Sequence, residues 1–355
     1  MQSQKNRPTP EIKKEVPPKV IIDPRARIAY ASYYIQGLID MFGVKNVSFR
    51  MDPFKNLIQK NDESAFDQYF SFIINDKGQT RKIVIDYKDS YPINTSAYEW
   101  CDVYGKVNFN TEKTDRTQYA RIIPIGPGFG IKIWNNPKTL FKAVVNFIRC
   151  RRFLNSKLYP FFYGYYWQTR RLPFSGFNSI PADGSYVFFV SSLWTQENCI
   201  KTTNVLRAFF VKSSKSLNIN FEGGLYAKPS NPEYRKYEDL VYTEFISFPT
   251  YLKKIQKSSV VFNTPSVYNC HGWKLGEFFA LGKAIISTPL SNAMPVELEH
   301  GKNIHIINDK SELAEALHKI LEDNNYRAEL EKGASEYFQK YLSPIKVIEK
   351  LLSVN

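Results

Sequence analysis

One segment, residues 260–307, constrains the fold of this chain more than any other. It contains an apolar run, VVFNTP, a polar turn, a helical stretch, WKLGEFFALG, and further apolar runs at 283–287 and 304–307. Short strands that alternate with helices of about ten residues are typical of parallel βαβ units. In such sheets, ligands bind at the carboxyl ends of the strands. The segment therefore predicts an α/β domain with a ligand site where the helix begins.

The first turn of this helix carries a cation and a carboxylate. Lys274 and Glu277 are three residues apart, which places them on one helical face. A lysine beside the free N–H groups of a helix N-terminus suits a phosphate, and a carboxylate suits ribose hydroxyls. The preceding turn holds His271, which fits a turn role or a site role equally, and Gly272, which allows a backbone or a ligand to approach closely. The pattern predicts a nucleotide site.

The same segment resembles the donor-binding signature of GT-B glycosyltransferases. The matching elements are a glycine-bearing turn, a helical glutamate, an alanine, a glycine and an aliphatic strand, here Gly272, Glu277, Ala280, Gly282 and 284–287. The basic-x-x-acid spacing of Lys274 and Glu277 is also similar to exostosin-like transferases. The resemblance implies two Rossmann-like domains that face a cleft, with the C-terminal helix returning to the N-terminal domain. It also implies that Lys274 binds the diphosphate and Glu277 the ribose of a nucleotide sugar.

Position 269 departs from the retaining members of that fold. They hold a second glutamate eight residues before the helical one, and this chain has Asn269 there. An amide can donate a hydrogen bond to a sugar hydroxyl, but it supplies no negative charge to an oxocarbenium-like centre. Both inverting and retaining chemistry remain open at this stage.

Further donor contacts are expected earlier in the C-terminal half. Ser191 and Ser192 end an apolar strand, where a GT-B donor domain would contact phosphate, and Lys201 or Arg207 would add a cation. Because cations and N–H groups can neutralise a leaving diphosphate, and because no Asp-x-Asp triplet occurs, we expect neither a metal nor another cofactor.

The N-terminal half should bind the acceptor and, in an inverting reaction, provide a general base. The three candidates for that base are Asp23, at the end of the first strand, and Asp86 and Asp89 in IVIDYKDS. Arg25 and Arg27 are candidates for binding an anionic acceptor or a phosphate.

The expected organisation is a disordered tail followed by two α/β domains. Alternating β-type and helical patterns in the N-terminal half indicate a Rossmann-like domain, and Gly126–Gly130, GPGFG, is expected to be a loop rather than a phosphate cradle because no Gly-Lys-Ser/Thr follows. The predicted boundaries are 1–18 for the tail, 19–155 with a returning helix at 338–355 for the acceptor domain, 156–182 for a basic-aromatic connecting segment and 183–337 for the donor domain.

A formal net charge of +14 requires an anionic partner or a generally basic surface. Arginines and aromatic rings interleave over residues 149–171, a mixture that suits an anionic membrane interface or stacking on single-stranded nucleic acid. The chain has no recognition-helix, RNP or zinc-finger pattern, so membrane contact is preferred and no nucleic acid is expected. No apolar stretch is long enough to span a membrane, and four scattered cysteines match no metal or disulfide pattern. A cytoplasmic protein, peripheral on the inner membrane face, fits best.

The sequence thus predicts a metal-independent glycosyltransferase that moves a sugar from a nucleotide sugar to a glycan or lipid-linked acceptor in surface polysaccharide synthesis. The rival hypothesis is a non-catalytic GT-B-like subunit that binds nucleotide sugars or acts as a scaffold. Asn269 is the feature that keeps this rival open.

Overall fold

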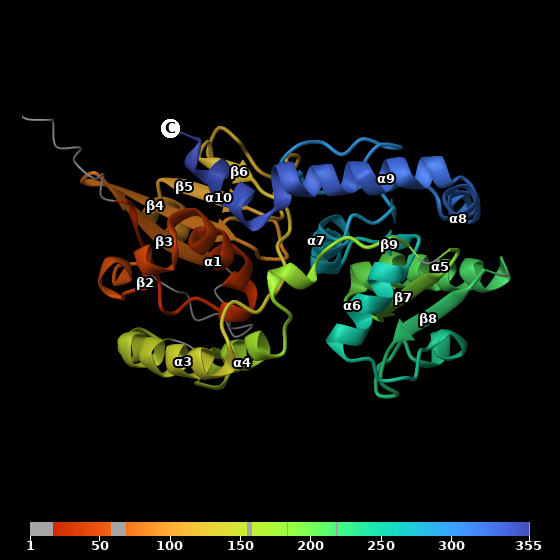
Figure 1. The fold of residues 1–355 in the computed structure, drawn as a ribbon, viewed down its shortest axis with the longest axis horizontal. Coiled ribbons are helices and arrows are strands. Elements are labelled where there is room, and N and C mark those ends of the chain that lie inside the picture. The colour runs from red at the N-terminus through yellow and green to blue at the C-terminus, as the bar shows by residue number, and fades with distance from the viewer. Residues whose placement is uncertain (1–16, 58–68, 155–157, 183, 218, 355) are drawn as a thin grey trace, which may run out of the picture.

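The computed structural model of the chain describes residues 17–57, 69–154, 158–182, 184–217 and 219–354. Almost all of the predicted tail, 1–18, lies outside these residues. Two α/β units lie side by side, the N-terminal one formed largely by residues up to 169 and the C-terminal one by residues 187–337 (Figure 1).

The N-terminal domain is a mixed sheet covered by helices. Its elements are β1 (Lys19–Ile22), α1 (Ile28–Phe42), β2 (Val47–Phe49), β3 (Tyr69–Asp76), β4 (Gln79–Asp86), α2 (Thr95–Trp100), β5 (Val103–Lys106), β6 (Ile122–Pro124), α3 (Asn136–Cys150) and α4 (Leu158–Thr169). The strand order is β2-β1-β3-β4-β5-β6. Every neighbouring pair is parallel except those that β3 forms with β1 and with β4.

The antiparallel strand β3 departs from the purely alternating pattern that the sequence suggested. Only Lys77 and Gly78 separate β3 from β4, and both have positive φ angles, 47° and 85°. Two left-handed residues form the tight turn that matches the twist of a β-hairpin. A two-residue connection cannot make the crossover that parallel strands require, so β3 and β4 must pair antiparallel.

The C-terminal domain has the parallel strands that residues 260–307 predicted. Its elements, with the terminal helix of the chain, are β7 (Val187–Ser192), α5 (Asn204–Ser216), β8 (Phe221–Tyr226), α6 (Phe248–Lys257), β9 (Val261–Asn263), α7 (Trp273–Ala280), β10 (Ile285–Ser287), β11 (His305–Ile306), α8 (Leu313–Glu322), α9 (Asn324–Tyr337) and α10 (Pro344–Leu352). The ladders run β11-β10-β9 and β7-β8, all parallel. Between β7 and β9, the Ser258 hydroxyl accepts from the backbone N–H of Phe188 at 2.9 Å, so a side chain substitutes for part of the ladder.

The C-terminal helix returns to the N-terminal domain, as the resemblance implied. α10 lies against α1 (Figure 1). Tyr33 donates a hydrogen bond to the Leu342 carbonyl at 2.6 Å, and a Cβ at Gly37 would lie 2.2 Å from the Pro344 carbonyl oxygen. Only glycine permits that approach, so this contact is built into the sequence of α1.

Candidate functional site

A pocket of about 270 Å³ lies at the carboxyl ends of β7 and β9, where the two domains meet. Its wall from the C-terminal domain includes the strand ends, the turn before α7 and the first turn of that helix. The N-terminal domain contributes two residues. The lining residues are Tyr30, Asp89, Ser191, Ser192, Trp194, Arg207, Phe262, Asn263, Thr264, Ser266, Val267, Cys270, His271, Gly272, Trp273 and Lys274. We call this the donor pocket. It lies at the strand ends where the sequence predicted a ligand site.

Arg207 is a buried cation in this pocket. Its Nε donates to the Thr264 hydroxyl at 3.0 Å, and its Nη1 donates to the Ser192 carbonyl at 2.7 Å. Burial lowers the pKa of Arg207 to about 10, which still leaves it charged at neutral pH. Among the described residues no carboxylate lies within ion-pairing distance of it. The two hydrogen bonds hold the guanidinium at the carboxyl end of β7 and leave its charge uncompensated.

Lys274 is the second cation of the donor pocket. Its Nζ donates to the Val190 carbonyl, so it reaches from α7 back to the end of β7. Burial and the nearby Arg207 charge lower the pKa of Lys274 to about 7, and Glu277 opposes that effect. Two cations near one another destabilise each other unless an anion joins them. The N-terminus of α7 also favours a bound anion, because no side chain caps its free N–H groups.

Two buried side-chain nitrogens of residues that line the pocket have no hydrogen-bond partner among the described residues. Within the part of the chain that the structure describes, neither His271 Nε2 nor Trp194 Nε1 forms a hydrogen bond. Burial lowers the pKa of His271 to about 4, so its ring is neutral at physiological pH. Its backbone N–H donates to Asn108 Oδ1 of the N-terminal domain at 2.8 Å. Unsatisfied buried polar atoms are rare, and a bound polar ligand would satisfy both.

Glu277 lies one turn deeper than Lys274 and does not line the donor pocket. Its side chain is buried, and burial raises its pKa, while Arg171 and Lys274 lower it. Arg171, from the segment after α4, also lies over the rings of Trp273 and Phe248, with centroid distances of 5.1 and 4.7 Å. Arg171 was not predicted as a site residue, because the residues around it in the sequence do not indicate that it packs against α7. The ribose-binding role of Glu277 stays a prediction.

Asn269 faces a different space. It lines a larger neighbouring pocket of about 720 Å³, together with residues 110–113 of the N-terminal domain and 288–294 of the C-terminal domain. Asn269 and Tyr268 both have left-handed φ angles, 59° and 57°. Two successive non-glycine residues in this region are uncommon and store backbone strain, which occurs most often at functional sites. The Asn269 carbonyl accepts from Asn292 Nδ2 at 3.0 Å, which helps to hold the turn.

Hydrogen bonds between the two domains border this second pocket. Asn110 Nδ2 donates to the Ser291 carbonyl at 2.9 Å, and the Ala293 N–H donates to the Phe109 carbonyl at 2.8 Å. The two pockets therefore lie on either side of the turn at 268–271, and both are completed by residues from the N-terminal domain. We call the larger one the second pocket.

Of the three aspartates predicted as a base, only Asp89 lines the donor pocket. Asp23 is buried in an ion pair with Arg25, with an Oδ2–Nη2 distance of 2.7 Å. Asp86 is buried against Lys106, whose Nζ lies 2.9 Å from its Oδ2, and it also accepts from Tyr104 Oη at 2.6 Å. Placing Asp23 and Asp86 in the cleft was therefore wrong, because neighbouring cations hold them inside the N-terminal domain. Desolvation raises the pKa of Asp89.

Arg25 and Lys201 also do not reach either pocket. Arg25 donates to Asp23 and to the carbonyls of Phe54 and Leu57, so its predicted phosphate role is wrong. Lys201 is exposed and pairs with Glu197 at 2.6 Å, so Arg207 rather than Lys201 supplies the cation.

Arg27 lies beside the site rather than in it. It stacks over the ring of Tyr30, a residue of the donor pocket, at 4.3 Å from the centroid. Arg27 itself is not among the residues that line either pocket.

The glycines near α7 differ in what surrounds them. A Cβ at Gly276 would lie 2.5 Å from the Pro127 carbonyl oxygen, so the loop of residues 126–130 packs directly on this helix. That sequence is a loop, as predicted, and it joins the two domains. Gly272 has open space around its Cβ position, on the pocket side of the turn.

Comparison with known proteins gives a family match over the C-terminal half of the chain. Residues 185–323 match the family described as Glycosyl transferases group 1, a span that contains every residue that the C-terminal domain contributes to the donor pocket. Comparison with curated proteins gave no match.

Three solved structures are among those that this chain resembles. TarM of S. aureus has 13% identity and a TM-score of 0.43 over 75% of this chain and 47% of that chain, so this chain spans about half its length. HepE of Anabaena, in complex with UDP, has 15% identity and a TM-score of 0.38 over 74% of this chain and 80% of that chain. The C-terminal domain of LpcC, a glycosyl transferase group 1 family protein from Francisella tularensis, has 15% identity and a TM-score of 0.33 over 45% of this chain and 87% of that chain.

Proposed function

We propose that this chain, whose residues 185–323 match the glycosyl transferases group 1 family, moves a sugar from a nucleotide-sugar donor to a glycan or lipid-linked acceptor in surface polysaccharide synthesis. The observation that supports this most is the pair of cations in the donor pocket, of which Arg207 is buried and Lys274 is half-buried. Arg207 and Lys274 meet at the uncapped N-terminus of α7. A diphosphate supplies the negative charge that this arrangement lacks.

In this proposal the protein stabilises the leaving group electrostatically. As the glycosidic bond breaks, negative charge develops on the β-phosphate, and Arg207 and Lys274 lie where they can meet it. Donors that are already in place and desolvated contribute more to the transition state than to the ground state. Two cations and the helix N-terminus can do this without a metal ion, so metal independence follows as part of the proposal.

The acceptor would enter from the N-terminal side. Asp89 is the only predicted base that faces the donor pocket, and its raised pKa favours accepting a proton from a sugar hydroxyl. His271 Nε2 and Trp194 Nε1 would bind hydroxyl or phosphate oxygens of the donor. Glu277 would reach the ribose only if nucleotide binding opens the pocket wall at Lys274.

Asn269 bears on the stereochemistry. Position 269 lines the second pocket rather than the donor pocket, and its amide carries no negative charge for a retaining reaction, so we propose an inverting reaction that uses Asp89. The same amide supports the second candidate, a non-catalytic subunit that binds nucleotide sugars. The two candidates differ in turnover and not in binding.

The test measures release of nucleoside diphosphate from a panel of UDP-, GDP-, ADP- and dTDP-linked sugars, with and without EDTA. We expect turnover with at least one donor, undiminished by EDTA. Lys274→Ala should lower kcat by about 100- to 1000-fold, because it removes a leaving-group contact. The matched control, Lys201→Ala, removes a cation that lies outside both pockets and should leave kcat unchanged.

Other outcomes would contradict parts of the proposal. Nucleotide-sugar binding without turnover on any acceptor would favour the scaffolding subunit. Loss of activity with EDTA would overturn metal independence. Equal effects of the two lysine variants would remove the donor pocket from the mechanism.

A further inference from the structure

Helix α3 exposes large apolar side chains and buries polar ones, which is the opposite of most surface helices. Its inward side carries polar Thr139 and Asn146 beside Ala143, all buried. Large apolar side chains face outward: Leu140, Phe141, Val144 and Ile148 have exposed fractions of 68%, 65%, 46% and 60%. Their spacing of three and four residues places them on one stripe. A surface helix normally turns this stripe toward the core.

Helix α4 continues the same surface. It lies beside α3, where Phe147 packs against Phe162 with ring centroids 5.3 Å apart and Asn146 donates to Tyr165 Oη at 2.9 Å. Its outward residues are also large: Leu158, Tyr159, Phe162, Tyr166 and Trp167 are all exposed. We call these nine exposed side chains of the two helices the α3–α4 face. Lone exposed apolar residues need no explanation, but nine on two adjacent helices form a patch that marks an interaction site.

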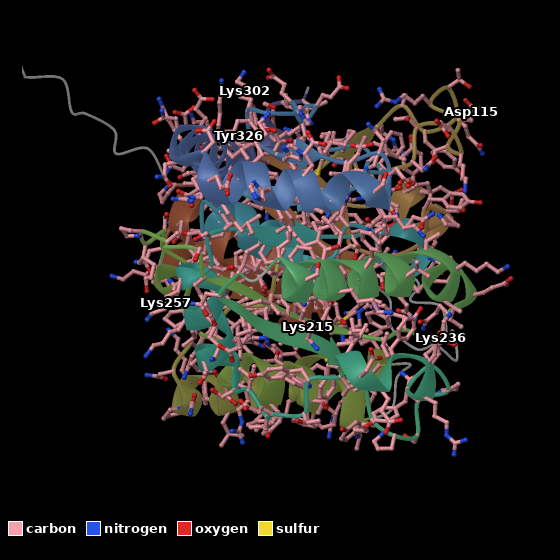
Figure 2. The ribbon with its side chains drawn as sticks, turned by 90° about the vertical axis from the view of Figure 1, so that its right-hand side faces the viewer. Asp115, Lys215, Lys236, Lys257, Lys302 and Tyr326 are labelled. Atoms are coloured by element: carbon pink, nitrogen blue, oxygen red, sulfur yellow. The ribbon has the colours of Figure 1, made fainter. Side chains whose placement is uncertain are left out.

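The segment that carries the α3–α4 face has charge of one sign. Between residues 136 and 171 the sequence contains eight lysines and arginines and no aspartate or glutamate. On the C-terminal domain, Lys215, Lys236 and Lys257 lie apart from one another (Figure 2). This segment of 36 residues therefore carries a formal charge of +8, against +14 for the whole chain.

A basic recess adjoins the apolar stripe at the end of α3. It has a volume of about 490 Å³ and shares Ile148 with the α3–α4 face. Its charged residues are Arg50, Asp52, Lys55, Arg149, Arg151 and Arg152. The only carboxylate, Asp52, pairs with Lys55 at 2.6 Å, so the arginines dominate the recess. Phosphate groups suit such a cluster.

We propose that the α3–α4 face docks on an anionic lipid surface. The leucine, isoleucine, valine and phenylalanine side chains would enter the acyl boundary, while Tyr159, Tyr166 and Trp167 lie at headgroup depth. The arginines beside α3 would meet lipid phosphates. The charge selects this partner, because a protein surface that covered so many cations would need matching carboxylates, and a second copy of the same face would repel it. In both views the two helices lie on the opposite side of the molecule from α9 (Figures 1 and 2).

The α3–α4 face extends beyond residues 149–171, the range for which the sequence predicted membrane contact. The stripe on α3 lies N-terminal to that range and supplies the most exposed aliphatic side chains, whereas Phe161 and Tyr165 within it are buried. No helix among the described residues is long and apolar enough to cross a membrane. The docking does not depend on sugar transfer, so its test is independent of the proposed activity.

The experiment is co-sedimentation of the full chain with vesicles of phosphatidylcholine, alone or mixed with phosphatidylglycerol. We expect binding to the mixed vesicles and little to the neutral ones. Phe141→Asp should weaken binding about tenfold or more, because it removes a large apolar group and adds a repelled charge. The matched control is Phe245→Asp, at a side chain that is 94% exposed on the C-terminal domain, and it should bind as the parent does.

The electrostatic part has its own variant. Arg149→Glu with Arg152→Glu should abolish the preference for phosphatidylglycerol, whereas Lys212→Glu with Lys228→Glu, which makes the same change in net charge on the C-terminal domain, should keep it. Thermal unfolding of each variant checks that it is folded. Equal pelleting of the Phe141 and Phe245 variants would overturn the proposal. So would a dimer in size-exclusion chromatography that Phe141→Asp dissociates while vesicle binding is unchanged.

Discussion

Both domains bury charged side chains, but they do so in opposite ways. In the N-terminal domain each buried cation has a carboxylate: Arg25 pairs with Asp23 at 2.7 Å, and Lys106 pairs with Asp86 at 2.9 Å. In the donor pocket Arg207 and Lys274 donate only to a hydroxyl and to backbone carbonyls. Lysine and arginine therefore form buried ion pairs in the N-terminal domain, whereas in the donor pocket they leave a net positive charge.

We propose that the difference separates residues that hold the fold from residues that bind a ligand. A buried charge without a counterion is costly, and a protein retains it where a bound anion compensates it. In the ion pairs of the N-terminal domain the compensation comes from within the chain. In the donor pocket Glu277 offsets part of the Lys274 charge, and no carboxylate among the described residues lies within ion-pairing distance of Arg207, which is the physical basis for proposing a diphosphate there.

The largest expected effect on stability comes from breaking one of the buried ion pairs of the N-terminal domain. Asp86→Ala leaves the Lys106 ammonium buried without its carboxylate and should lower the free energy of unfolding by about 3–5 kcal/mol. Urea denaturation measures this. Adding Lys106→Met should recover much of the loss, because the double variant leaves no unpaired charge. If the double variant is no more stable than Asp86→Ala, the loss of stability does not come from an unpaired Lys106 charge.

A smaller and opposite effect is expected in the donor pocket. Arg207→Met removes a cation that has no counterion, so the free energy of unfolding should stay constant or rise. The affinity for a nucleoside diphosphate should fall about 10- to 100-fold, since charge-assisted contacts contribute roughly 1.5–3 kcal/mol each. Calorimetric titration measures the affinity, with Lys201→Met as the control that leaves it unchanged. A large loss of stability without loss of affinity would make Arg207 a structural residue.

The smallest effect is a pH dependence that belongs to Lys274. Its pKa of about 7 in the free protein means that it loses its charge as pH rises above 7, whereas a bound diphosphate would raise that pKa. Affinity should therefore be highest at and below pH 7 and should fall by up to about tenfold per pH unit above it, until the pKa of the complex is reached. Lys274→Arg keeps its charge throughout and should flatten the profile. An equally steep profile in Lys274→Arg would assign the effect to another group.

The elements that were predicted well are those with local patterns. The apolar runs and turns of residues 260–307 became β9, α7, β10 and β11, because strand and helix periodicity is carried by neighbouring residues. The returning helix expected at 338–355 likewise became α10. The hairpin of β3 and β4 was not anticipated as antiparallel, although Lys77-Gly78 is a short enough connection to have indicated it.

The choice between Lys201 and Arg207 shows where local patterns end. Lys201 and Arg207 are six positions apart, which corresponds to about 240° around the axis of an α-helix, so they face different directions. The sequence does not state which direction is inward, and the π-helical turn Cys199–Thr203 changes the phase before α5 begins. Only the packing of α5 against the sheet places Arg207 in the pocket and Lys201 in solvent.

By itself, the sequence determined that polar and charged groups gather at strand ends and at the start of α7, because these positions follow from the chain's own periodicity. Tertiary structure alone decided which charges neutralise one another. Lys106 lies beside Asp86 because β4 and β5 pair in that register, and no carboxylate lies within ion-pairing distance of Arg207 among the described residues. Pairing depends on distances between residues far apart in sequence, which helix phase and strand register set together. That is why the pocket at the start of α7 could be located from the sequence, whereas the separation of Asp23 and Asp86 from Asp89 could not.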